Sequence, residues 1–255
     1  MKRLVWLLAM MVAVAVSAGD VLWRFAPETV DFDPGTTCEK TKNGWTLKHR
    51  IHCLSKEAFE IKPNAKYCIL IKVRSLSPEK TRLWVITKNI DAQGREIPPT
   101  TVDSDVNTVA ALDTVIHRGS REIKVAGAEK WPEVKRGTVL VFNAQPDGSD
   151  LPNLVYYPIK SIGEDGVVTL DRPLRQDYPA GTFVRRHFRR GPYHSLISAM
   201  LNTTEFRVYR RNISGISERG CDVSHWLRGA VKVHIGIGAD HDIEVAECCF
   251  KEISE

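Results

Sequence analysis

Hydrophobic and polar residues alternate along much of the chain with the two-residue period of a β-strand. Apolar side chains in the segments 67–73 and 231–238 alternate with polar residues or glycines, which predicts strands with one buried face. The segment 82–88 is rich in β-branched and aromatic residues, which favour strands. Further strands are expected at 206–208 and 243–250. Because helical periodicity is weak throughout, the sequence predicts an all-β protein.

The middle of the chain has shorter and more closely spaced strands than its two ends. Between residues 101 and 187, turns rich in glycine and proline separate short apolar segments. Strands are expected there at 122–126, 138–142, 155–162, 167–170 and 182–187. This pattern predicts a small barrel or a curled sheet.

The two ends are expected to form one domain around the middle part. We predict an outer β-sandwich of residues 19–100 plus 195–255, interrupted by an inserted small β unit of residues 101–194. The alternative is two consecutive domains, which leaves 195–255 with too few strands for a core of its own. Insertions at exposed loops are well tolerated, so the nested arrangement is favoured.

Residues 1–18 have the organisation of a secretory signal peptide. Lys2 and Arg3 precede an apolar run at 4–16, and small residues follow at positions 17 and 18. The alternative is a membrane anchor, but this run is shorter than the roughly 20 residues that a bilayer core requires. We therefore expect cleavage after position 18, a secreted or periplasmic protein, and no membrane span in the mature chain.

Charge and cysteine content bear on nucleic acid binding, disulfides and metal sites. The net charge is +5 over 255 residues, and two of the basic residues lie inside the signal. This charge is too small and too dispersed to indicate nucleic acid. All six cysteines follow the signal, so an oxidising compartment permits disulfides between them, with buried free thiols as the alternative. Without a C-x-x-C pair, a cysteine metal site is not indicated.

Three passages of the outer part resemble jelly-roll carbohydrate-binding modules with a galactose-binding-like sandwich, as found in secreted bacterial proteins. They are the strand entry at 58–67, the strand 83–88 with its D-x-x-G turn at 91–94, and the closing strands 230–237 and 243–250. The resemblance implies a jelly-roll β-sandwich with an inserted small β-barrel-like unit. It also implies glycan binding, and it transfers no functional residue to this chain.

Candidate ligand contacts are one aromatic residue and one basic segment. Trp226 lies in an expected loop, where an indole can stack on a sugar ring, and a core-capping position is the alternative. The segment 185–194 holds four arginines and two histidines, and its candidate contacts are Arg185, His187, Arg189 and Tyr193. Guanidinium groups bind carboxylates and sulfates bidentately, so an acidic glycan suits this segment. A solvated basic strand edge is the alternative.

Recognised catalytic motifs are missing from the sequence. It contains no G-x-S-x-G nucleophile elbow, no H-E-x-x-H zinc motif and no glycine-rich phosphate loop. A non-catalytic glycan-binding or surface protein is therefore favoured. One alternative is a polysaccharide lyase, in which His, Arg and Tyr neutralise a uronate and remove its C5 proton. A second is an envelope or assembly protein without a small ligand.

No cofactor is expected from the sequence. The turn Asp147–Asp150 is rich in oxygen ligands, as calcium prefers, but it lacks the further ligands of a calcium loop. An ordinary turn is therefore favoured over a structural calcium site. The segment 240–242 is interpreted as a hairpin turn. Trp84 lies inside an apolar strand, which predicts a position in the core.

Overall fold

The computed structural model describes residues 19–188, 191–202 and 204–253. Within these ranges the chain forms three antiparallel sheets and no α-helix. The only helical elements there are short 3₁₀ turns: η1 (Pro27–Thr29), η2 (Pro99–Thr101), η3 (Val106–Thr108) and η4 (Ala128–Lys130). The all-β prediction is confirmed. The expected signal peptide, residues 1–18, and the candidate contact Arg189 lie outside the described residues.

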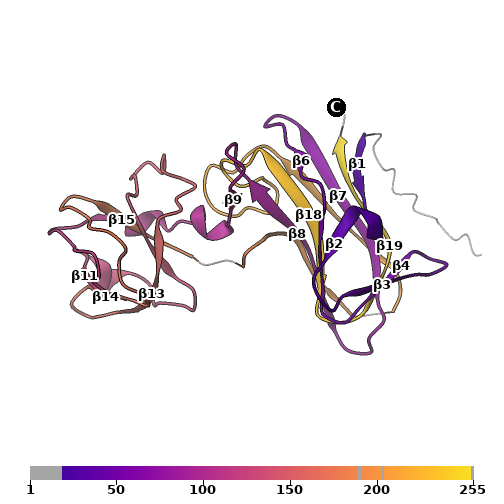
Figure 1. The fold of residues 1–255 in the computed structure, drawn as a ribbon, viewed down its shortest axis with the longest axis horizontal. Helices are drawn as coiled ribbons and strands as arrows, with labels where there is room; N and C mark the ends of the chain where they lie inside the picture. The colour runs from indigo at the N-terminus through magenta and orange to yellow at the C-terminus, as the bar shows by residue number, and fades with distance from the viewer. Residues whose placement is uncertain (1–18, 189–190, 203, 254–255) are drawn as a thin grey trace, which may run out of the picture.

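Two of the sheets pack face to face as a β-sandwich (Figure 1). The first sheet has the strand order β17-β7-β19-β4-β3, with β1 paired to β19. Its strands are β1 (Val21–Arg24), β3 (Thr37–Lys40), β4 (Trp45–Lys48), β7 (Lys66–Ser75), β17 (Arg207–Ser214) and β19 (Ile243–Ile253).

The second sheet has the strand order β16-β8-β18-β5-β2, with β6 paired to β18 and β9 to β8. Its strands are β2 (Val30–Phe32), β5 (Ile51–Ser55), β6 (Phe59–Glu60), β8 (Thr81–Ile90), β9 (Glu96–Ile97), β16 (His194–Leu201) and β18 (Lys232–Ala239). In both sheets, strands from before position 98 pair with strands from after position 193.

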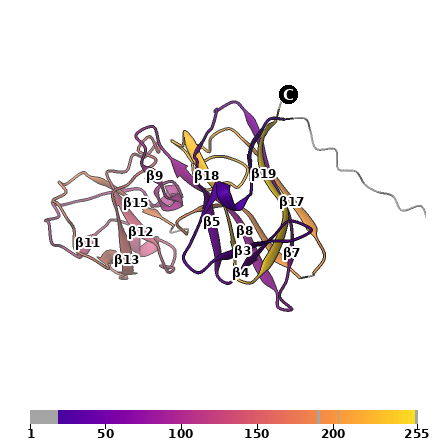
Figure 2. The ribbon, with the colours of Figure 1, turned by 45° about the vertical axis from the view of Figure 1, so that its right-hand side comes forward.

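The third sheet is built only from the middle of the chain, in the order β10-β15-β12-β13-β14-β11. Its strands are β10 (Ala110–Ala111), β11 (Glu122–Lys124), β12 (Val139–Phe142), β13 (Tyr156–Ile162), β14 (Val167–Leu170) and β15 (Phe183–His187). They curl into a small barrel-like lobe beside the sandwich, as Figures 1 and 2 show. We call this lobe the insert.

Alternation of side chains along the strands creates the core of the sandwich. In β8, Leu83 and Val85 are fully buried between the sheets, and Ile235 of β18 packs in the same layer. At one end of this core, the rings of Tyr67 and Phe250 stack with centroids 5.3 Å apart. Such aromatic contacts add to the burial of apolar surface that drives folding.

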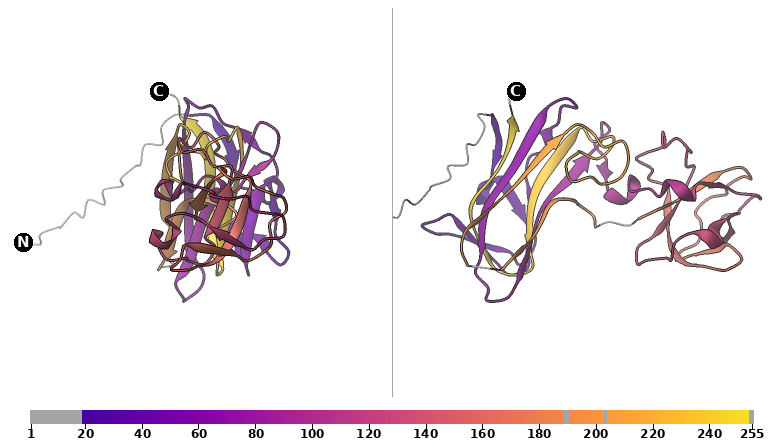
Figure 3. Two further views of the ribbon diagram at one scale, coloured as in Figure 1. Left: turned by 90° about the vertical axis from the view of Figure 1, so that its left-hand side faces the viewer. Right: turned by 180° about the vertical axis from the view of Figure 1, so that it is seen from behind.

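The insert has a separate hydrophobic core. Phe142 of β12 stacks on Tyr178 with ring centroids 4.0 Å apart, and Leu140 and Ile123 are fully buried around them. The chain enters the insert after β9 and leaves it before β16, so both connections join one end of the sandwich (Figure 3). The insert therefore projects from the sandwich as a second lobe.

All six cysteines lie within the described part of the chain, and none forms a disulfide. Cys53 of β5 and Cys248 of β19 are buried in the sandwich core. The disulfide framework that export would permit is thus not formed here, and these side chains act as small apolar groups. Within the described residues, no helix is long and apolar enough to cross a membrane.

Candidate functional site

A cleft of about 610 Å³ opens on the outer face of the second sheet. Strands β8, β5 and β18 form its base, and the segment just before β16 forms one wall. The residues that matter for its chemistry are Asp33, Arg50, His52, Trp84, Tyr193, Gly238 and Asp240. Of the contacts expected from sequence that the structure describes, only Tyr193 lines this cleft.

Trp84 lies on the base of the cleft because β8 alternates its side chains between two faces. Leu83 and Val85 point into the core, so Trp84 between them points outward and is half-buried. The guanidinium of Arg82 lies over the indole, 5.7 Å from the ring centroid. The expectation that Trp84 belongs to the core is therefore wrong, although the strand around it was predicted.

A glycine in β18 leaves the middle of the cleft floor open. Gly238 pairs in register with Trp84 on one side and with His52 on the other. A Cβ atom at Gly238 would lie 3.5 Å from Cε3 of Trp84 and 4.0 Å from Cδ2 of His52. Since glycine has no side chain, the indole is bordered by open space instead of by a neighbouring side chain.

Polar groups surround this aromatic floor. Nδ1 of His52 lies 3.1 Å from Oδ1 of Asp33, an ion-pair distance without hydrogen-bond geometry. The ring of Tyr193 covers His52 with centroids 4.9 Å apart and an interplanar angle of 32°. Burial raises the pKa of Tyr193, and the negative charges of Asp33 and Glu96 raise it further, so the phenol stays protonated.

This arrangement suits a ligand with one apolar and one hydroxyl-rich side. An indole offers a broad flat surface, and the surrounding phenol, carboxylates and guanidinium can orient hydroxyl groups. Among the residues that the structure describes, no group of three His, Cys, Asp or Glu side chains could hold a metal ion.

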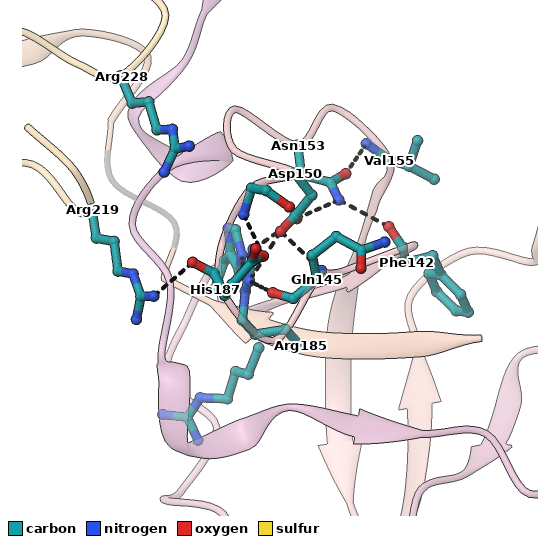
Figure 4. A network of polar contacts seen from close by, with 12 residues as sticks. Phe142, Gln145, Asp150, Asn153, Val155, Arg185, His187, Arg219 and Arg228 are labelled. Carbon is teal, nitrogen blue, oxygen red and sulfur yellow. Dashed lines mark hydrogen bonds and ion pairs between the residues drawn. The ribbon is translucent and has the colours of Figure 1, made fainter. Parts of the chain in front are cut away.

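The expected contacts Arg185 and His187 belong to a buried network in the insert, shown in Figure 4. Nη2 of Arg185 lies 2.8 Å from Oδ2 of Asp150, and its Nε donates to Nε2 of His187 at 3.0 Å. Nδ1 of His187 lies 2.8 Å from the carbonyl of Thr100 in η2. These partners require a neutral imidazole that accepts at Nε2 and donates at Nδ1.

Electrostatics agree with this protonation state. Burial lowers the pKa of His187 to about 4, and the charge of Arg185 acts in the same direction. Burial alone would raise the pKa of Asp150, but hydrogen bonds from Asn153 and from the Gln145 amide, together with Arg185, lower it. Asp150 is thus the counterion of Arg185, which explains how this arginine can be buried.

The network and its neighbours also fasten the insert to the sandwich. Arg219, in the loop after β17 of the sandwich, donates from Nη2 to the carbonyl of Asp147 at 2.7 Å. The backbone amide of Asn153 donates to the carbonyl of Thr101 at 2.9 Å, at the end of η2 where the chain enters the insert. The side chain of Asp147 accepts from the Ser149 amide, as in an ordinary turn. Arg185 and His187 therefore offer no surface to a ligand, and their role in this structure is structural.

Trp226 is also buried completely. Its indole packs edge-on against Tyr67 and Phe250, with centroids 5.6 Å and 5.9 Å away. The loop that carries it folds over the end of the sandwich, and its strand-like bridge to Ile216 holds it there. Of the two interpretations of Trp226, the core-capping one describes this structure.

Comparison with known proteins adds little to this picture. No family model matches the chain, and no curated protein sequence matches it significantly. The xylan-binding CBM22-1 domain of Xyn10C from Paenibacillus barcinonensis is similar at a TM-score of 0.40 and 8% identity, over 94% of this chain and 99% of that one. VP17, a capsid protein of bacteriophage P23-77, gives a TM-score of 0.16 and 9% identity over 89% and 99% of the two chains. At such low TM-scores neither similarity carries an argument.

Proposed function

We propose that this protein binds a glycan in the cleft on the outer face of the second sheet, without catalysing a reaction. The observation that carries the proposal is the outward-facing Trp84 beside the open floor at Gly238. A sugar ring stacked on this indole would have its hydroxyl groups within reach of Tyr193 and Asp33. Export by the expected signal peptide would bring the cleft into contact with extracellular or periplasmic glycans.

The charges of the cleft give an acidic glycan no advantage over a neutral one. Two exposed carboxylates, Asp33 and Asp240, are balanced by two exposed guanidiniums, that of Arg50 in the lining and that of Arg82 over Trp84. The acidic partner expected from sequence depended on the segment 185–194, whose Arg185 is buried and already paired with a carboxylate. An acidic sugar would therefore gain no net electrostatic attraction at this cleft.

The cleft contains His, Arg and Tyr residues, as a lyase would need, but the burial of His52 and the protonation of Tyr193 favour binding over catalysis. Both ring nitrogens of His52 are buried, so the imidazole cannot reach a substrate proton without a rearrangement. The raised pKa of Tyr193 keeps its phenol protonated, which makes it a poor base. We expect no unsaturated uronate product when acidic polysaccharides are incubated with the protein.

A glycan array followed by calorimetry tests the proposal. Binding of a neutral oligosaccharide should weaken by about tenfold or more in Trp84→Ala, because the stacking surface is lost. The matched control is Trp45→Ala on the opposite sheet, where Lys40 lies over a half-buried indole at the same 5.7 Å distance as Arg82 over Trp84. Failure to bind any neutral glycan, or equal loss in both variants, would contradict the proposal.

A further inference from the structure

We propose that the insert carries a second binding site, centred on Trp131, for a sugar that bears a carboxylate. This site is separate from the cleft and does not depend on the function proposed for it. Trp131 follows η4 and is half-buried. Two hollows, of about 480 Å³ and 370 Å³, are both lined by Trp131 and Pro132. Trp131 therefore borders two concave surfaces while it packs against the core of the insert.

The two hollows differ in charge. The larger one is lined by Lys130 and Asp105, with the polar side chains of Asn107 and Thr108 beside them. The carboxylate of Asp105 accepts a hydrogen bond from the Asn107 amide at the start of η3. The smaller hollow is lined by the three acidic residues Glu129, Glu133 and Glu164 and by Lys160. An anionic group is therefore better accommodated in the larger hollow.

A buried cation behind the wall of the larger hollow strengthens this difference. Arg186 is 1% exposed and pairs in register with Leu140, on the face of β15 opposite to Arg185. Its Nη1 donates to the carbonyl of Pro132, and its guanidinium lies over the ring of Phe188 at 5.2 Å. Among the described residues no carboxylate lies within ion-pair distance of Arg186 and its buried Nε has no acceptor, but Asp105 in the hollow attracts the guanidinium from farther away.

An unpaired buried guanidinium is unusual because desolvating a charge is costly unless a counterion compensates it. Arg186 contacts two residues of the hollow, since its amide also donates to the Thr108 hydroxyl at 3.0 Å. Its charge acts on the hollow across a low-dielectric wall, where electrostatic interactions are stronger than in water. Together with the exposed Lys130, it gives the larger hollow a net positive charge despite Asp105.

Trp131 and the larger hollow would each bind a different part of the ligand. The ring of a uronate would stack on Trp131, and its carboxylate would enter the larger hollow near Lys130 and Asn107. Neutral sugars would find the same stacking surface without the electrostatic attraction. An acidic sugar is thus favoured over a neutral one at this site, whereas the cleft gives it no such advantage.

The test is NMR spectroscopy of the ¹⁵N-labelled protein, in which each tryptophan gives its own indole N–H signal. Tetragalacturonate is titrated into the whole protein, with cellotetraose as the neutral probe, and the Trp131 signal is assigned with Trp131→Phe. Tetragalacturonate should shift the Trp131 signal at lower concentration than the Trp84 signal. Added sodium chloride should weaken the effect, because the attraction is electrostatic.

Two matched variants locate the anion. Lys130→Gln should weaken tetragalacturonate binding by about tenfold, whereas Lys160→Gln in the smaller hollow should leave it unchanged. Both side chains are exposed, so folding should survive either change. The proposal is overturned if Trp131 does not respond, if cellotetraose binds there equally well, or if the two lysine variants behave alike. The proposed binding of neutral glycans at Trp84 is tested by the glycan array and Trp84→Ala, and none of the outcomes at Trp131 decides it.

Discussion

The ion pair between Arg185 and Asp150 gives the sharpest stability prediction. The side chains are 1% and 7% exposed, and each makes several hydrogen bonds within the insert. Asp150→Asn keeps the size of the side chain but removes its charge, so the guanidinium of Arg185 stays buried without a counterion. Breaking a buried pair in this way costs about 3–5 kcal/mol.

A double replacement separates the cost of an unpaired charge from the value of the pair. In Arg185→Met with Asp150→Leu, both charges are removed and the apolar side chains fill similar volumes. The remaining loss is that of a few hydrogen bonds, including those with His187 and Gln145. We expect this double variant to be destabilised by less than about 2 kcal/mol.

Hydrogen exchange measured by mass spectrometry is the appropriate assay, because the insert can open separately from the sandwich. Peptides from β12 and β15 should lose protection in Asp150→Asn, while peptides from β7 and β19 serve as internal controls. The reasoning is refuted if protection in β12 falls by less than about 1 kcal/mol, or if the double variant is as unstable as the single one.

Three further predictions follow from other parts of the structure. Gly238→Leu should abolish glycan binding in calorimetry by filling the cleft floor, while Gly238→Ala should bind more weakly but measurably. His187 binds a proton at higher pH when unfolded than when folded. The free energy of unfolding should therefore fall by about 3 kcal/mol as the pH drops from about 6.5 to about 4. In urea titrations, His187→Gln should not show this loss of stability with falling pH. Burial raises the pKa of Cys53 to about 12 and that of Cys248 well above its usual value, so iodoacetamide should label both only after denaturation, and a disulfide-linked peptide would contradict this.

Strand positions could be predicted from sequence wherever one face of a strand is apolar and the other polar. The segments 231–238 and 243–250 correspond to β18 (Lys232–Ala239) and β19 (Ile243–Ile253). A period of two determines which residues are buried, and it does not require knowledge of the neighbouring strands. The alternation also holds at Trp84, but β8 carries apolar residues on both faces, since Trp84 and Ile86 line the outer cleft. The pattern of β8 alone therefore does not show which face is the core.

The candidate contacts could not be placed from sequence because their burial depends on distant partners. Arg185 is buried since Asp150 lies 35 positions away in the chain and supplies a counterion. Trp226 is buried since its loop reaches Tyr67 and Phe250, which belong to two different strands of the first sheet. Register within one strand gives no information about such contacts. The choice of contacts from local charge and aromatic content therefore included residues that are buried in the folded protein.

The placement of β19 has consequences for how the chain folds. This last strand of the sandwich pairs with β7, β4 and β1, so the first sheet cannot close until residues 243–253 are available. The sheet of the insert does not depend on the C-terminal strand, because its six strands all lie between positions 110 and 187. Proteins with many distant pairings fold slowly, and domains with local contacts fold sooner. During synthesis the insert should thus fold first, while the apolar strands that precede it remain exposed and prone to aggregation until β19 emerges.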